Sequence, residues 1–147
     1  MKETGEPIGI SACLAGKHCR YDGKHSKDEE LLKNLQGKRL ILICPEELGG
    51  LPTPRPKAWL MGGDGFEVLL GKGFVVSEEG KDVTSNFISG AAKALAMLLA
   101  EDVKTVYVKE KSPSCGFNIT TVDQNKINGK GVFSALALLS KLKVIGR

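Results

Sequence analysis

Short apolar runs recur along the chain, and each has the length of a β-strand. They lie at 8–12, 40–43 and 105–108. The run at 40–43 is unbroken, a pattern typical of a strand buried on both faces of a parallel sheet. A last strand, at the sheet edge, is expected at Val144–Ile145. Two further apolar runs, 66–70 and 74–76, flank Gly71-Lys72-Gly73 and predict a small β-hairpin.

Between the strands, apolar residues recur at the spacing of amphipathic helices. One helix is expected from Val83 to about Glu101, with Asp82 as its cap, and another from about Gly131 to Lys141. A shorter helix follows Ser26-Lys27-Asp28-Glu29, whose Ser-x-x-Glu form is that of a capping box, and it ends at Gly37. Because strands alternate with helices, we expect an α/β domain with a mainly parallel sheet.

Composition limits the class of protein. With 147 residues, of which 41% are hydrophobic, the chain suits one globular domain over residues 1–147. No apolar run reaches the roughly 18 residues of a membrane span, and the N-terminus lacks the apolar stretch of a secretion signal. We therefore expect a cytoplasmic protein, a monomer or small homo-oligomer, with no membrane partner.

The net charge of +4 is mild and carries no strong signal for a polynucleotide partner. Basic residues are nevertheless dense in the segment that follows the first cysteine, at Lys17, Arg20, Lys24 and Lys27. Such a stretch can hold one or two phosphates of a small ligand, with Arg20 as the candidate contact, or it can be a solvated loop.

Four cysteines carry the clearest chemical signal: Cys13, Cys19, Cys44 and Cys115. Cysteines in a reducing compartment are seldom disulfide partners, and no C-x-x-C pair is present. Cys13 and Cys44 end two predicted strands, and Cys115 lies just beyond a third. The carboxyl ends of parallel strands share one edge, where α/β sheets bind ligands, so we expect these three thiols to converge. The alternative is three small buried apolar residues.

Three converging thiolates without a nearby histidine suit a soft metal, either zinc or an iron–sulfur cluster. Three protein ligands would leave one coordination position open for water or substrate, as in catalytic metal sites. Cys19 lies six residues after Cys13 in a glycine-containing loop. We interpret it as a bystander; a fourth ligand or a sulfur-carrying thiol is the alternative.

Polar groups accompany two of these cysteines. Only Pro45 separates Glu46 from Cys44, so a rigid turn would hold this carboxylate close to the thiols, where it can move protons. Ser112 and Ser114 precede Cys115, and either hydroxyl can hydrogen-bond a substrate or a sulfur atom. The alternatives are an exposed loop acid and ordinary turn chemistry.

Several motifs occur together and in order over nearly the whole chain. They are Ile10-Ser11-Ala12-Cys13-Leu14-Ala15-Gly16, Cys19-Arg20-Tyr21-Asp22-Gly23, Cys44-Pro45-Glu46 with Gly49-Gly50-Leu51, Pro54-Arg55-Pro56, Gly80-Lys81-Asp82-Val83-Thr84 and Lys109-Glu110-Lys111-Ser112-Pro113-Ser114-Cys115-Gly116. In these the sequence resembles the thiouracil desulfidase family, small single-domain iron–sulfur proteins. The resemblance implies a Rossmann-like, three-layer α/β domain with a 4Fe–4S cluster.

Carried over residue by residue, the resemblance implies Cys13, Cys44 and Cys115 as cluster ligands, with Glu46 and Ser112 as the catalytic carboxylate and hydroxyl. The reaction it implies is a non-redox desulfidation of thiolated pyrimidines, as thiouracil or as 4-thiouridine nucleotides, which releases hydrosulfide. The partner is then a small thiolated base or nucleotide. Two other readings stay open: a non-enzymatic sulfur carrier or redox sensor that uses the cysteines, and a structural zinc domain.

Overall fold

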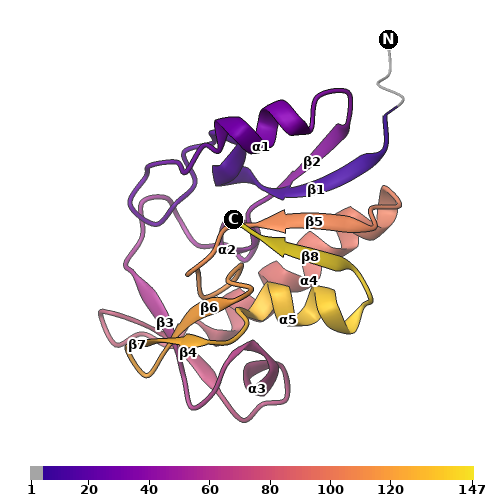
Figure 1. The fold of residues 1–147 in the computed structure, drawn as a ribbon. Helices are drawn as coiled ribbons and strands as arrows, with labels where there is room; N and C mark the ends of the chain where they lie inside the picture. Colours follow the sequence, from indigo (N-terminus) through magenta and orange to yellow (C-terminus); the bar gives the residue numbers. More distant parts are fainter. Residues whose placement is uncertain (1–4) are drawn as a thin grey trace.

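Two four-stranded sheets form the frame of the molecule, which a computed structural model describes over residues 5–147 (Figure 1). The first sheet has the order β2-β1-β5-β8, and all its neighbouring strands are parallel. Its strands are β1 (Pro7–Ser11), β2 (Arg39–Ile43), β5 (Thr105–Val108) and β8 (Lys143–Gly146). The mainly parallel sheet expected of an α/β protein is confirmed, and so is the edge strand near the C-terminus of the chain, which is β8.

The second sheet, with the order β4-β3-β6-β7, was not expected from the sequence. It consists of β3 (Ala58–Met61), β4 (Phe74–Ser77), β6 (Ile119–Val122) and β7 (Asn125–Asn128). β3 and β6 run parallel, whereas the two outer pairs are antiparallel. A two-residue turn joins β6 to β7, and both of its residues, Asp123 and Gln124, have positive φ, as type I′ hairpin turns require.

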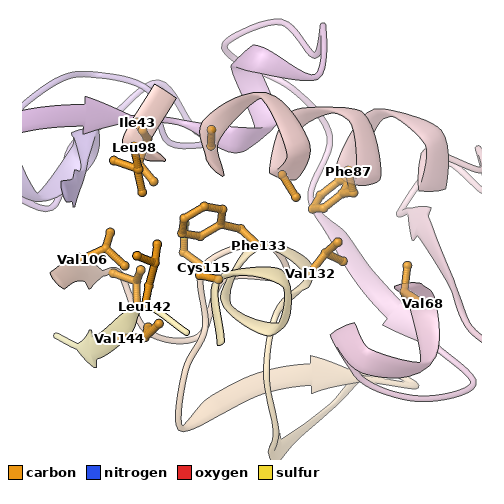
Figure 2. Close-up of a cluster of buried hydrophobic side chains, with 14 of the residues drawn as sticks. Ile43, Val68, Phe87, Leu98, Val106, Cys115, Val132, Phe133, Leu142 and Val144 are labelled. Carbon is orange, nitrogen blue, oxygen red and sulfur yellow. The ribbon is translucent and has the colours of Figure 1, made fainter. Parts of the chain in front are cut away.

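The helices cover the sheets and supply much of the core. They are the 3-10 helix η1 (Ala12–Ala15), α1 (Glu29–Asn34), α2 (Pro45–Leu48), α3 (Gly65–Leu69), α4 (Thr84–Ala100) and α5 (Val132–Leu139). α4 packs against both α2 and α5, and Figure 2 shows Phe133 of α5 beneath α4, close to Leu98 and Cys115. None of the helices within residues 5–147 combines the length and hydrophobicity needed to cross a bilayer.

The two long helices lie where their apolar spacing predicted them, as α4 and α5. The hairpin predicted over 66–76 is wrong, because residues 65–69 form α3 and Phe74 begins β4, which pairs with β3. The missed signal is a capping box. The Asp64 side chain accepts a hydrogen bond from the Phe66 amide, and the Glu67 side chain accepts one from the Asp64 amide.

Two smaller expectations also need correction. The cap of α1 is Asp28, whose carboxylate accepts a hydrogen bond from the Leu31 amide at 3.0 Å, whereas the Ser26 hydroxyl accepts one from Arg20. β2 is not buried on both faces, since it is the edge strand of its sheet and Leu42 is 41% exposed. An unbroken apolar run cannot distinguish an edge strand from a central one, because strand order is decided by tertiary packing.

Candidate active site

The carboxyl ends of the parallel strands carry the candidate site. Cys13 follows β1 within η1, Cys44 follows β2 as the residue before α2, and Cys115 lies in the loop between β5 and β6. The register of β1 and β2 places Ser11 opposite Ile43, so the first two cysteines leave the sheet at the same edge. A pocket of about 300 Å³ opens there, and all four cysteines line it.

All four cysteines are free thiols, and three of them pack together. Cys13, Cys19 and Cys44 form a small cluster with Ala12, and the Cys44 thiol donates a hydrogen bond of 3.8 Å to the Cys19 carbonyl. Cys115 reaches the pocket from the main core and is also buried. Cys19 therefore packs against Cys13 and Cys44, closer to them than its interpretation as a bystander suggested.

The surroundings raise the pKa of three of these thiols, those of Cys19, Cys44 and Cys115. Contact with the Cys13 thiol, together with burial, raises the pKa of Cys19 to about 11. Burial raises the pKa of Cys115 to about 12, and contact with Cys19 followed by burial raises that of Cys44. Over residues 5–147, no three His, Cys, Asp or Glu side chains are arranged around a single metal ion.

A carboxylate stands beside the thiols, at the first turn of α2. Pro45 occupies the first position of this helix, where its missing N–H costs nothing, and Glu46 follows it. Glu46 Oε2 accepts hydrogen bonds from Ser114 Oγ at 2.9 Å and from Ser112 Oγ at 3.4 Å. The two serine hydroxyls lie 3.0 Å apart. The three polar residues expected beside the cysteines thus form one hydrogen-bonded group.

Hydrogen bonds within the loop hold the two serines and Cys115 in place. Ser112 Oγ accepts from the backbone amides of Ser114 at 3.1 Å and Cys115 at 3.0 Å. The Ser134 hydroxyl of α5 donates to the Cys115 carbonyl at 2.7 Å. Because Ser112 already accepts two bonds, its own proton is directed to an acceptor such as Glu46 or a bound molecule.

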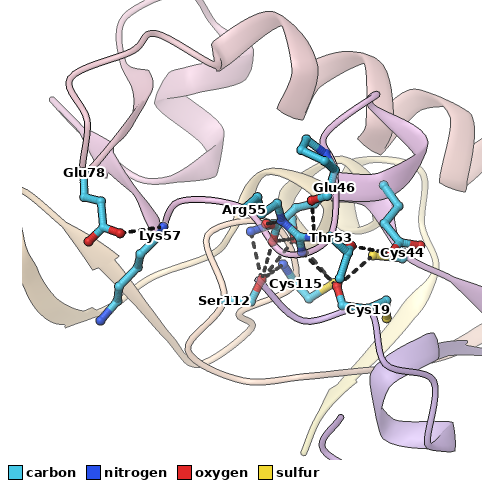
Figure 3. A network of polar contacts seen from close by, with 12 residues as sticks. Cys19, Cys44, Glu46, Thr53, Arg55, Lys57, Glu78, Ser112 and Cys115 are labelled. Carbon is cyan, nitrogen blue, oxygen red and sulfur yellow. Dashed lines mark hydrogen bonds and ion pairs between the residues drawn. The ribbon is translucent and has the colours of Figure 1, made fainter. Parts of the chain in front are cut away.

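Sequence reasoning missed two charged residues that organise this pocket. Glu110 accepts backbone hydrogen bonds from Phe117, Asn118 and Ile119, which closes the loop that carries Cys115. Arg55 pairs with Glu46 (Figure 3). Arg55 belongs to one of the motifs noted in the sequence, but nothing in that motif indicates that Glu46 is its partner. The role of Glu110 as an acceptor also has no sequence signal, because its donors are backbone amides seven to nine residues later.

Positive charge surrounds the pocket, and it comes from segments far apart in the sequence. The cationic residues that line it are Arg20, Arg55, Lys57, Lys109, Lys111 and Lys126, against only Glu46 and Glu110 among the acids. Burial lowers the pKa of Lys109. Of the basic stretch noted in the sequence, Arg20 alone lines the pocket, where it also contacts Asp22 and Ser26. Lys17 instead pairs with Glu47.

The fold is α/β, and one pocket gathers four cysteines, a carboxylate that accepts hydrogen bonds from two serines, and a wall of cationic side chains. These features define a class of small α/β proteins with a cysteine-lined pocket. Comparison with known proteins identifies the family within that class. The sequence model of the 2-thiouracil desulfurase family matches residues 8–146, and the chain belongs to this family. The resemblance drawn from the motifs is thereby confirmed.

Two individual relatives show the same relationship. The chain is 41% identical over 141 residues to the uncharacterized protein YbbK of Bacillus subtilis (strain 168), a match covering 94% of this chain and 93% of the relative. Among solved structures, it is similar to a 4Fe–4S-dependent thiouracil desulfidase, TudS, with a TM-score of 0.83 and 37% identity. That match covers 97% of this chain and 91% of the other.

Proposed function

We propose that this protein is a 4Fe–4S-dependent desulfidase that converts thiolated pyrimidines into their oxo forms without net oxidation or reduction. The observation that carries the proposal is the shared pocket, in which Glu46 and its two serines lie beside cysteines from three strand ends. Membership of the 2-thiouracil desulfurase family supports the activity. Water supplies the oxygen atom and two protons, so the balanced products are the oxo-pyrimidine and hydrogen sulfide.

The donor chemistry of the pocket fits an iron–sulfur cluster. We assign Cys13, Cys44 and Cys115 as its ligands, because they come from the ends of three different strands. Burial raises the pKa of the Cys115 thiol, so a nearby positive charge is needed to favour its thiolate form, and iron bound by thiolates provides one. Cys13, Cys44 and Cys115 would each hold one iron of such a cluster, which would leave the fourth iron without a protein ligand and would supply a Lewis acid for the sulfur of the substrate.

The residues of the chain handle the water and its protons. Glu46 accepts a proton from the attacking water at Oε2, the oxygen that the two serines approach, and returns it to the departing sulfur. The same carboxylate then transfers the second proton, from the new hydroxyl group on the pyrimidine carbon, to the sulfur, which leaves as hydrogen sulfide. Ser112, which accepts two backbone amides, presents its proton to orient the water or the pyrimidine. Ser114 holds the substrate next to the carboxylate. Burial of these groups strengthens each of the interactions.

The charge of the pocket favours an anionic substrate. Six cationic side chains against two carboxylates attract a phosphate, so 4-thiouridine nucleotides suit the pocket better than neutral thiouracil. We place the phosphate near Arg20, which carries a planar guanidinium and lies among the lining residues. The prediction is a lower KM for 4-thiouridine monophosphate than for 2-thiouracil.

Anaerobic reconstitution with iron and sulfide tests the proposal. The loaded protein is incubated with 2-thiouracil or 4-thiouridine monophosphate, and hydrogen sulfide and the oxo-pyrimidine are measured. Equal amounts of both products are expected. Alanine replacement of Cys13, Cys44 or Cys115 should abolish the visible absorbance of the cluster, whereas Cys19→Ala, the matched control, should retain it. A fully loaded protein that converts no thiolated pyrimidine would refute the activity.

A sulfur carrier or redox sensor built on Cys19 is the second candidate. Its proximity to Cys13 and Cys44 favours it, but a reactive thiol is exposed and has a lowered pKa. Cys19 is 2% exposed, and its pKa is raised. The Cys19→Ala variant separates the two functions, because desulfidation survives this change and a Cys19-based response to oxidants does not.

A further inference from the structure

Arg55 is the cationic partner of Glu46 in the pocket, and the proposed reaction above assigns it no role. We propose that Arg55 is a positioning residue: its guanidinium fixes the Glu46 carboxylate so that Oε2 faces the serines and the attacking water. This inference rests on the proposed function for its kinetic consequence. The position of the Glu46 carboxylate can be measured without any substrate.

The contact between the two side chains is buried. Arg55 Nε donates to Glu46 Oε1 at 3.0 Å, and the side chains are only 4% and 14% exposed (Figure 3). Of the described ion pairs this is the most buried, since each of the others has at least one side chain more than 25% exposed. An ion pair shielded in this way is weakly screened by salt and holds one geometry.

The other guanidinium nitrogens are also occupied. Nη1 donates to Thr53 Oγ1 at 2.9 Å and to the Pro52 carbonyl at 3.2 Å, and Nη2 donates to the Cys19 carbonyl at 2.9 Å. The backbone amide of Arg55 donates to the Tyr21 carbonyl at 2.8 Å. Since backbone acceptors on two sides hold the guanidinium, it cannot follow Glu46 if the carboxylate moves.

The two oxygens of Glu46 therefore have separate tasks. Oε1 is occupied by Arg55, whereas Oε2 accepts from Ser112 and Ser114 on the side of the thiols. A rotation of the carboxylate would exchange these oxygens and lose the bond to Arg55. A lysine at position 55 would keep the charge, but its compact ammonium lacks the planar fork that places separate donors on Glu46, Thr53 and the Cys19 carbonyl.

Two variants and one control test the inference. Arg55→Lys and Arg55→Gln are compared with Arg39→Lys, since Arg39 makes a half-exposed ion pair with Glu101 away from the pocket. The first measurement is the ¹³C resonance of the Glu46 side-chain carboxyl in the cluster-free protein, assigned with Glu46→Gln. It should shift in both Arg55 variants and remain unchanged in Arg39→Lys.

The second measurement is the steady-state kinetics of the loaded enzymes with 4-thiouridine monophosphate, per mole of cluster. We expect kcat to fall about 10- to 100-fold in Arg55→Gln and less in Arg55→Lys, with KM within about threefold of the parent. Iron and sulfide content should match the parent protein, because the three ligand cysteines are unaltered.

Other outcomes would overturn the inference. An unchanged Glu46 resonance in the Arg55 variants means that the carboxylate keeps its place without the guanidinium. A fall in kcat that only follows lost cluster content means that Arg55 supports the Cys19 loop alone. If the parent enzyme, fully loaded, converts no substrate, the proposed function fails, and the resonance still decides the positioning role.

Discussion

The contact between α4 and α2 offers a test of how the fold places the site. α2 begins one residue after Cys44 and contains Glu46, and it lies against Gly90 of α4. A Cβ added to Gly90 would meet the Pro45 carbonyl oxygen, with its carbon at 2.8 Å and the Gly49 amide nitrogen at 2.9 Å. We therefore predict that Gly90→Ala displaces α2.

The magnitude follows from two opposing effects. Alanine in place of glycine favours a helix by about 1 kcal/mol. To relieve the clash, the distance from the added Cβ to the Pro45 carbonyl carbon must grow from 2.8 Å to the 3.4 Å or more of ordinary contact, which moves backbone atoms. Overpacking of this kind costs about 1–3 kcal/mol or more. Because backbone cannot rotate away as a side chain can, the upper part of that range applies. The net loss expected is about 2 kcal/mol.

Thermal unfolding of the cluster-free protein measures this loss. For a domain of this size, about 2 kcal/mol lowers Tm by roughly 4–8 °C. Ser89→Ala is the matched control, since Ser89 is the exposed neighbour in the same helix, and its Tm should stay within about 2 °C of the parent. A Tm of Gly90→Ala equal to or above the parent would show that α2 is not held against α4 as described, and would refute the reasoning.

Three further predictions follow from individual contacts. Asp28→Ala removes the cap of α1 and its bond to Arg147, and should cost about 1 kcal/mol at pH 7. The bond from Arg147 lowers the pKa of Asp28, so its stabilising effect is present above the unfolded value of about 3.9 and is lost as pH falls through the lower folded value. The difference in unfolding free energy between parent and variant should then shrink below about pH 4; a difference that persists at pH 2 contradicts this. Glu110→Gln weakens the charge-assisted bonds that close the Cys115 loop and should cost about 1–3 kcal/mol and lower the bound iron per protein; unchanged iron content and Tm would exclude this role. Removal of iron by a chelator should leave a cooperative unfolding transition, since the buried core between α4 and α5 is complete without it, and loss of that transition would show that the metal is needed for folding.

Much of the site was predictable because it depends on a rule about strands. Cys13, Cys44 and Cys115 each follow an apolar run of strand length, and parallel strands bring their carboxyl ends to one edge. Their convergence on one pocket needed only the correct type of sheet. Glu46 and Ser114 then met because each is within two residues of one of these cysteines.

Other features depended on which distant segments pack together. β3 and β6 pair across about sixty residues, so the assembly of the second sheet could not be predicted locally, although the apolar run at 74–76 belongs to its strand β4. Arg55 reaches Glu46 only because the segment before β3 lies across the first turn of α2. The cations of the pocket come mainly from Lys57, Lys109, Lys111 and Lys126, whereas the basic run in the sequence contributes Arg20 alone.

The amino-acid sequence by itself therefore determined where the parallel strands end and which thiols, carboxylate and serines lie close to those ends. These features depend on the local spacing of apolar residues and on the direction of the chain. Only the tertiary structure decided how each group is constrained: that Arg55 occupies one oxygen of Glu46, that Cys19 lies among the other thiols, and that Glu110 closes the Cys115 loop. The physical reason is range. Side-chain hydrogen bonds act over about 3 Å, so they depend on which surfaces the packed core brings into contact.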